Sequence, residues 1–236
     1  EYPGRLMIKT HRVPPARVGV LAHPPSRSFL SALRAAERDR PQPRSPTTFR
    51  VLFVGRVDDP RKNFPLLLES YLQARREGAR VSLTVVGPHT EKWRDALGNL
   101  PREHDITIAG RVNENALVRA YLDHQALILS SKQEGFGIVV AEAFHAGLPV
   151  ISTRCGGPEA TIDVSGGGLL TGHSSAEMSR AIAHMATSAE DRERMAARAL
   201  EHARSELSFD VFRERVRALT AAIPTRPSSS RSLSEI

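Results

Sequence analysis

The 236-residue sequence has little cysteine, few aromatic residues and no long apolar run. Cys155 is the only cysteine, so the chain cannot form an internal disulfide, and a cysteine-based zinc cage lacks its thiolates. We therefore expect a reducing, cytoplasmic compartment. No apolar run approaches the roughly 20 residues that cross a bilayer, and we find no apolar core of a secretory signal.

Lysine is also scarce, although the chain is basic. Only four of its 33 basic residues are lysine, and the net charge is +7. This charge suits phosphorylated substrates, an anionic membrane surface or nucleic acid. Because the positive residues are scattered and not interleaved with aromatic ones, we expect no nucleic-acid binding. Peripheral contact with a membrane remains compatible with the charge.

From residue 50 onwards, short apolar segments alternate with stretches of helical spacing. Strands are predicted at 51–55, 81–87, 106–110, 126–129, 149–153 and 168–170. Helices are predicted at 64–77, 91–100, 114–124, 138–146, 176–187, 189–205 and 209–223, with Ser188 capping the helix at 189–205. This alternation predicts an α/β fold with a Rossmann-like, doubly wound parallel sheet and extra C-terminal helices.

The sequence divides into three parts. Residues 1–49 are too few for a domain and contain a predicted strand at 17–22, a helix at 28–38 and a proline-rich linker at 40–48. Residues 50–223 form the predicted domain. Residues 224–236 are rich in Pro, Ser and Arg and are expected to be disordered.

The carboxyl ends of the predicted strands carry cations, glycines and carboxylates. Ligands bind at this edge of an open parallel sheet. The side chains expected there are Arg56 and Lys62, then His89, Arg111, Glu134 and Glu159. Cations and bare amides suit a diphosphate, and carboxylates suit the vicinal hydroxyls of sugars. Together they indicate a nucleotide-sugar site, although each cation taken alone is more typical of a solvated loop.

The stretch from Glu134 to Glu142 combines two carboxylates with a Gly-Phe-Gly turn. Its glycines allow the backbone to approach a ligand closely. The helix predicted at 138–146 would present unpaired amides and a positive dipole end to an anion. Glu142 lies inside that apolar helix, where an ionised carboxylate needs a partner. Alternatively, Glu142 and His145 mark the solvent-facing stripe of the helix.

Two other motifs have simpler interpretations. Asp58 and Asp59 resemble a metal-binding pair, but we expect them to serve as acids at the N-terminus of the next helix. Cys155 is expected to be a small packed residue rather than a nucleophile, because no base is apparent near it in the sequence.

In combination, these motifs resemble the fourth family of retaining nucleotide-sugar glycosyltransferases. The matching motifs are Gly55-Arg56 with Lys62, the run from Glu134 through Glu142, Ala146-Gly147-Leu148-Pro149-Val150-Ile151, and Gly156-Gly157-Pro158-Glu159. The resemblance covers residues 50–171 closely and the helices up to residue 223 more loosely. It implies the GT-B fold, in which two Rossmann-like domains face each other across a cleft. This chain would then be mainly the C-terminal, donor-binding domain.

The resemblance also implies a role for each site residue. Arg56 and Lys62 would grip the donor diphosphate, with Glu134 beside the transferred sugar; these three form the expected catalytic set. The expected donor-binding residues are Gly55, Arg111, Val112, Gly135, Phe136, Gly137, Ile138 and Glu142. Among them, Glu142 would accept hydrogen bonds from the ribose, and Arg111 and Val112 would contact the base.

The implied reaction transfers a sugar from a UDP- or GDP-linked donor to an unknown acceptor, with retention of configuration. It needs no metal and no further cofactor. Residues 1–30 resemble a remnant of the acceptor-binding N-terminal domain, and the sequence starts at Glu1 without a methionine. We therefore expect a chain that binds donor nucleotide but needs an N-terminal acceptor domain to transfer sugar efficiently.

Three alternatives differ in how well the sequence supports them. A dinucleotide-dependent oxidoreductase is disfavoured, because no Gly-x-Gly-x-x-Gly follows the first strand. A nucleotide-sugar epimerase or hydrolase of the same fold remains open. So does a non-catalytic nucleotide-sugar-binding subunit that pairs with another chain.

Overall fold

The computed structural model describes residues 9–12, 14, 18, 21–38 and 47–221. Within these ranges, six strands form one sheet in the order β3-β2-β1-β4-β5-β6. They are β1 Phe49–Val54, β2 Val81–Val86, β3 Ile106–Gly110, β4 Ala126–Leu129, β5 Val150–Thr153 and β6 Gly168–Thr171. Every neighbouring pair is parallel, which confirms the predicted doubly wound sheet.

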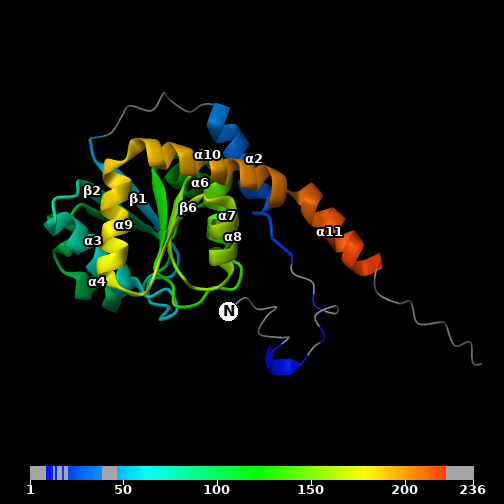
Figure 1. Ribbon diagram of the computed structural model, residues 1–236. Coiled ribbons are helices and arrows are strands. Elements are labelled where there is room, and N and C mark those ends of the chain that lie inside the picture. Colours follow the sequence, from blue (N-terminus) through cyan, green and yellow to red (C-terminus); the bar gives the residue numbers. More distant parts are fainter. Residues whose placement is uncertain (1–8, 13, 15–17, 19–20, 39–46, 222–236) are drawn as a thin grey trace, which may run out of the picture.

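Helices pack on both faces of this sheet (Figure 1). Buried apolar side chains form two hydrophobic clusters, one against each face of the sheet. The second cluster lies beneath α3 Phe64–Arg76 and α9 Ser175–Thr187. The first lies beneath α2 Arg27–Arg38, α6 Glu114–Asp123, α7 Ile138–His145, α8 Gly157–Ser165 and α10 Ala189–Glu206. Three further helices are α4 Glu91–Leu97, α5 Leu100–Glu103 and α11 Phe209–Ala221.

The strand sequences explain why both faces are covered. Successive side chains of a strand point to opposite faces, so Leu52 of β1 enters the cluster beneath α6 and α7. Val51 and Phe53 enter the cluster beneath α3 and α9. All three are almost completely buried. A strand that is apolar on both sides is typical of a parallel sheet between two helix layers.

Within residues 50–223, the structure differs from the prediction in two places. The helix expected at 91–100 is two short helices, because Gly98 ends α4 with a positive φ of 51°. The segment around Gly156 was interpreted only as a strand-end loop, yet α8 begins there. Pro158 lies in the first turn of α8, where its missing N–H costs no hydrogen bond, and Glu159 accepts a hydrogen bond from the Gly156 amide at 2.9 Å.

Of the predictions for residues 1–49, the helix is confirmed and the strand is wrong where the structure describes it. The helix expected at 28–38 is α2, which packs on α6 and buries Phe29 and Leu33 in the first cluster. The strand expected at 17–22 is wrong at residues 18, 21 and 22, which are not in a strand, and its other residues lie outside the described ranges. Most of the linker at 40–48 and the whole tail at 224–236 also lie outside them.

The C-terminal helices follow the predicted order, and Ser188 caps α10 by accepting a hydrogen bond from the Asp191 amide at 3.4 Å. The last of them, α11, extends away from the body of the domain and has no buried residue (Figure 1). None of the helices in the described ranges is both long and apolar enough to cross a membrane.

Candidate functional site at the carboxyl edge of the sheet

The strand order places a topological switch point between β1 and β4. From β1 the chain proceeds outwards through β2 and β3, and then returns to add β4, β5 and β6 on the other side. Ligands of doubly wound sheets bind at such a point. Here the two loops that leave it are joined. Ser130 donates a hydrogen bond to the Lys62 carbonyl at 2.8 Å, and the Lys132 amide donates to the Arg61 carbonyl at 2.7 Å.

Lys62 and Glu134 form an ion pair at this switch point. The Lys62 Nζ lies 2.7 Å from Glu134 Oε1, and the Ser131 hydroxyl donates to the same oxygen at 2.6 Å. The Lys62 side chain is 22% exposed and the Glu134 side chain is 13% exposed. They are therefore shielded from bulk water yet open on one side. A cation and a carboxylate so placed can reach a polyanion and a hydroxyl of one ligand.

The loop around Glu134 is fixed by close contact with the turn after β5. Glu134 donates its amide proton to the Cys155 carbonyl at 2.7 Å. A Cβ on Gly157 would lie 1.9 Å from the Gly135 carbonyl oxygen, so only glycine allows these backbones to meet. Gly137 has a φ of 76° and caps α7, whose first residue is Ile138. The glycines of the two motifs thus hold the start of α7 beside Glu134.

Glu142 is held by a residue that the sequence did not indicate. The Tyr121 hydroxyl of α6 donates to Glu142 Oε2 at 2.6 Å. Burial raises the pKa of the Glu142 carboxyl, and the Tyr121 hydrogen bond opposes that rise. Burial, together with the adjacent carboxylate, raises the pKa of Tyr121 well above its ordinary value. The side chain is only partly exposed, so the solvent-stripe interpretation does not hold for Glu142.

Arg56 is the most exposed member of the expected catalytic set. Its side chain is 56% exposed, and its Nη1 lies 3.7 Å from Asp58 Oδ1. The prediction that Asp58 and Asp59 are N-terminal acids of the next helix is wrong: Asn63 caps α3, and no acid lies in its first turn. Instead, Asp59 accepts hydrogen bonds from the amide and side chain of Arg61, which lower the Asp59 pKa to about 2.

The ends of β1, β2 and β3 lie side by side. The Gly55 amide donates to the Val86 carbonyl at 2.9 Å, and the Gly87 amide donates to the Gly110 carbonyl at 2.8 Å. A Cβ on Gly87 would lie 2.0 Å from the Gly55 carbonyl oxygen. Arg111 and Val112 therefore leave the sheet at the same edge as Arg56, two strands away from β1.

The structure thus brings some of the expected residues together and leaves others apart. Lys62, Glu134 and the loop that holds Gly135, Phe136 and Gly137 form one connected group. Glu142 lies about one turn into α7, which begins at Ile138. Arg111 is exposed, and Val112 is half-buried against the first cluster. Both follow β3 on the far side of the switch point. The roles expected for all these residues remain predictions.

Sequence reasoning missed two polar contacts in this region. Ser131 and Tyr121 touch the two glutamates directly. Ser131 lies only three positions before Glu134 in the sequence. Tyr121 belongs to a different helix from Glu142, and no local sequence pattern indicates their contact. Within the described residues, no group of three or more His, Cys, Asp or Glu side chains is placed to hold a metal ion. Cys155 is buried, and burial raises its thiol pKa, which agrees with a packed residue.

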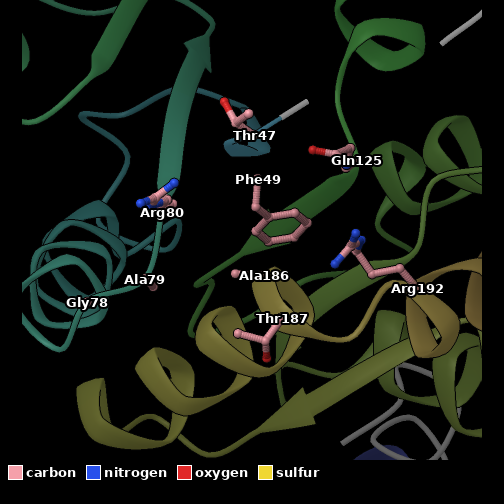
Figure 2. A pocket seen from close by; sticks show the side chains of 9 residues that line it. All are labelled: Thr47, Phe49, Gly78, Ala79, Arg80, Gln125, Ala186, Thr187 and Arg192. Atoms are coloured by element: carbon pink, nitrogen blue, oxygen red, sulfur yellow. The ribbon is translucent and has the colours of Figure 1, made fainter. Parts of the chain in front are cut away.

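A cavity of about 280 Å³ lies at the opposite, amino edge of the sheet (Figure 2). Arg80 precedes β2, Gln125 precedes β4, and Phe49 begins β1. The guanidinium of Arg192 stacks 5.3 Å from the Phe49 ring and donates to the Met185 carbonyl. This arginine thereby connects α10 to the sheet and the end of α9. We attribute the cavity to helix–sheet packing and place the candidate site at the carboxyl edge.

Comparison with known proteins shows the family and the fold of the chain. The family described as "Glycosyl transferases group 1" matches residues 35–202. A D-inositol 3-phosphate glycosyltransferase of Thermomonospora curvata is 27% identical over 231 residues, which are 90% of this chain and 53% of that protein. The chain thus spans about half the length of this curated relative.

Two solved structures show the same fold. A glycosyltransferase from Rickettsia africae has a TM-score of 0.73 at 15% identity, covering 92% of this chain and 60% of the other. HepE of Anabaena, solved in complex with UDP, has a TM-score of 0.65 at 19% identity, covering 84% of this chain and 54% of the other. At these identities the likeness extends to the fold, which is that of the C-terminal half of a GT-B glycosyltransferase.

Proposed function

The chain belongs to the family of group 1 glycosyl transferases, and we propose that its carboxyl edge binds a UDP- or GDP-linked sugar for transfer to an acceptor. One observation carries the proposal: the Lys62–Glu134 ion pair at the switch point of the sheet. A lysine already held beside a carboxylate can exchange that contact for a phosphate, and the carboxylate then becomes available to a sugar hydroxyl.

The phosphate half of the proposed site consists of Lys62, Arg56 and the start of α7. Arg56 is exposed and paired only with Asp58 in the described part of the chain, so its guanidinium can turn towards a diphosphate. The helix α7 begins at Ile138 after a glycine cap, so no capping side chain covers the amides of Ile138 and Val139, whereas the Val140 amide donates to the Gly137 carbonyl. These groups would neutralise charge as it develops on the departing nucleotide.

The sugar and ribose half consists of the two glutamates. Glu134 has one oxygen occupied by Lys62 and Ser131, and its other oxygen has no hydrogen-bond partner within the described residues. Glu142 likewise gives only one oxygen to Tyr121. Glu142 can therefore accept a hydrogen bond from a hydroxyl without losing Tyr121, and Glu134 becomes more available to one when Lys62 turns to phosphate. We assign Glu134 to the transferred sugar and Glu142 to the ribose.

The proposed reaction retains the configuration of the transferred sugar and does not use a metal. The acceptor attacks on the face from which the phosphate departs, and the departing phosphate takes the proton of the acceptor. The protein then contributes mainly electrostatic stabilisation of the phosphate. Loss of either cation should cost about 2–4 kcal/mol of transition-state stabilisation, by analogy with removal of one oxyanion donor.

Solved structures of similar fold support a nucleoside diphosphate as the ligand. HepE and the pneumococcal GtfA share this fold, and their structures contain UDP. Because this chain spans about half the length of the curated relative described above, the acceptor and the complete transfer reaction are proposals that reach beyond the described residues. We propose that the acceptor is bound by a separate N-terminal domain facing this edge.

Calorimetric titration of the 236-residue chain with UDP and GDP tests the proposal. We expect saturable binding of at least one of them, and no comparable binding of uridine or guanosine without phosphates. The Arg56→Ala variant should bind the same nucleotide several-fold more weakly. Arg102→Ala provides a matched control, because Arg102 lies in α5 before the amino end of β3. Absence of nucleotide binding by the unmodified chain would disprove the site.

A further inference from the structure

His89 follows β2 at the carboxyl edge and has a buried polar atom without a partner. Only two buried side-chain nitrogen or oxygen atoms among the described residues lack a hydrogen bond, His89 Nδ1 and Asp58 Oδ1. The Asp58 oxygen faces the Arg56 guanidinium at 3.7 Å, which accounts for it. Among the residues that the structure describes, no charged group pairs with His89. A buried N–H without an acceptor costs roughly 1–3 kcal/mol, so the unpaired Nδ1 constrains which ring nitrogen carries the proton.

The ring is held between two residues of neighbouring elements. Its centroid lies 5.5 Å from that of Trp93, in the first turn of α4. Its Cε1 lies 3.5 Å from the point that a Cβ on Gly110 would occupy. Gly110 ends β3 and directly precedes Arg111 and Val112. His89 is therefore fixed over the part of the edge that lies beside β3.

The burial of Nδ1 determines what the ring can offer to a ligand. A buried N–H without an acceptor is the rarer and less favourable arrangement, so the contacts favour the tautomer that carries its proton on Nε2. Nε2 has no hydrogen-bond partner in the described part of the chain and is not among its buried unpaired atoms, so it is accessible. His89 thus presents one N–H donor at the carboxyl edge.

This inference rests on the proposed function. We propose that His89 determines base specificity by donating its Nε2–H to O4 of uracil or O6 of guanine. The β2 and β3 ends lie one and two strands from β1, or about 5 and 10 Å at the usual strand spacing. That separation suits a nucleotide whose diphosphate lies at Lys62 and whose base extends towards Val112.

A donor at this position discriminates between bases. Uracil and guanine present a carbonyl oxygen where cytosine and adenine present an amino group, as thymine and guanine do in duplex DNA. An N–H donor therefore favours UDP and GDP over CDP and ADP. A phosphate contact would instead affect all four nucleotides, and pyrophosphate, to the same extent.

Calorimetry with UDP, GDP, CDP, ADP and pyrophosphate tests the inference. His89→Phe keeps an aromatic ring beside Trp93 and removes the donor, whereas His89→Gln retains a donor. In the unmodified chain we expect the carbonyl bases to bind more tightly than the amino bases. His89→Phe should weaken UDP or GDP binding about five- to tenfold, the usual loss for one hydrogen bond, and leave pyrophosphate binding unchanged. His89→Gln should restore most of the affinity for UDP or GDP but little of the base preference, because its amide oxygen also accepts from an amino group.

Matched variants separate failure of this inference from failure of the proposed function. His104→Phe changes a histidine at the amino end of β3 and should leave all affinities unchanged. If His89→Phe lowers the melting temperature, His89→Leu provides the same comparison. An unmodified chain that binds neither UDP nor pyrophosphate contradicts the proposed function. Suppose that the unmodified chain binds UDP. If His89→Phe then keeps the same base preference, or loses pyrophosphate affinity together with UDP affinity, the assignment of His89 alone is overturned.

Discussion

Removing the positive charge of Lys62 and removing the negative charge of Glu134 should change nucleotide affinity in opposite directions. Lys62→Met removes the cation and keeps an apolar stem of similar length. Glu134→Gln removes the negative charge and keeps a side chain that can accept from Ser131 and Lys62. If the pair is only a structural ion pair, both variants should lose stability and neither should affect a ligand specifically. If Lys62 exchanges Glu134 for phosphate, Lys62→Met should lose nucleotide affinity and Glu134→Gln should not.

The magnitudes follow from the geometry of the pair. The Nζ–Oε1 distance is 2.7 Å, and the side chains retain 22% and 13% of their exposure. Exposed pairs contribute about 0.2–1 kcal/mol and broken buried pairs cost about 3–5 kcal/mol, so Lys62→Met should lower the free energy of unfolding by roughly 1–2 kcal/mol. A lost charge-assisted contact with a diphosphate should cost about 2 kcal/mol of binding, or roughly 30-fold in Kd.

Glu134→Gln should bind UDP or GDP at least as tightly as the unmodified chain. It releases Lys62 from a competing anion and removes a negative charge from beside the phosphates. Calorimetry gives the affinities, and urea denaturation gives the stabilities of the same preparations. A Glu134→Gln variant that loses as much nucleotide affinity as Lys62→Met would refute the exchange of partners by Lys62.

Three further predictions concern the stability of the domain. Gly157→Ala places a Cβ 1.9 Å from the Gly135 carbonyl and should lower stability by about 1–3 kcal/mol in urea denaturation; Gly135→Ala, whose Cβ would meet no atom within 4 Å, should fold normally. Glu142 has a raised pKa, so its ionisation reduces stability as pH rises from its unfolded pKa to its folded one. Glu142→Gln should therefore gain stability relative to the unmodified chain between about pH 4 and about pH 7, and an equal difference at both would contradict the burial argument. Ser188→Ala removes a long, 3.4 Å cap and should cost about 0.5 kcal/mol by thermal unfolding; no change would mean that the cap does not stabilise α10.

The sheet could be predicted because each strand carries its own signal. In β1, Val51, Leu52 and Phe53 are apolar in succession, and such runs bounded by glycine are typical of strands buried on both faces. The site followed from the same pattern, since residues after parallel strands meet at one edge. Lys62 and Glu134, 72 positions apart, were expected there on that ground and do touch.

The partners of the two glutamates could not be predicted in the same way. Glu142 was expected to need a partner, but Tyr121 reaches it from α6 through the packing of helices, and no local spacing encodes that contact. The start of α8 was missed for a different reason. Gly156-Gly157-Pro158 is typical of a turn, and it becomes a helix N-terminus only because Glu159 closes back on the Gly156 amide.

The most direct test of the proposed site is a crystal structure of this chain soaked with UDP- and GDP-linked sugars. We predict density for one diphosphate within contact of Lys62 and Arg56, with the base towards Val112 and a hydroxyl on each of Glu134 and Glu142. Density confined to the cavity at the amino edge, around Arg80 and Arg192, would contradict the account. So would a fully occupied nucleotide that leaves the Lys62–Glu134 ion pair untouched.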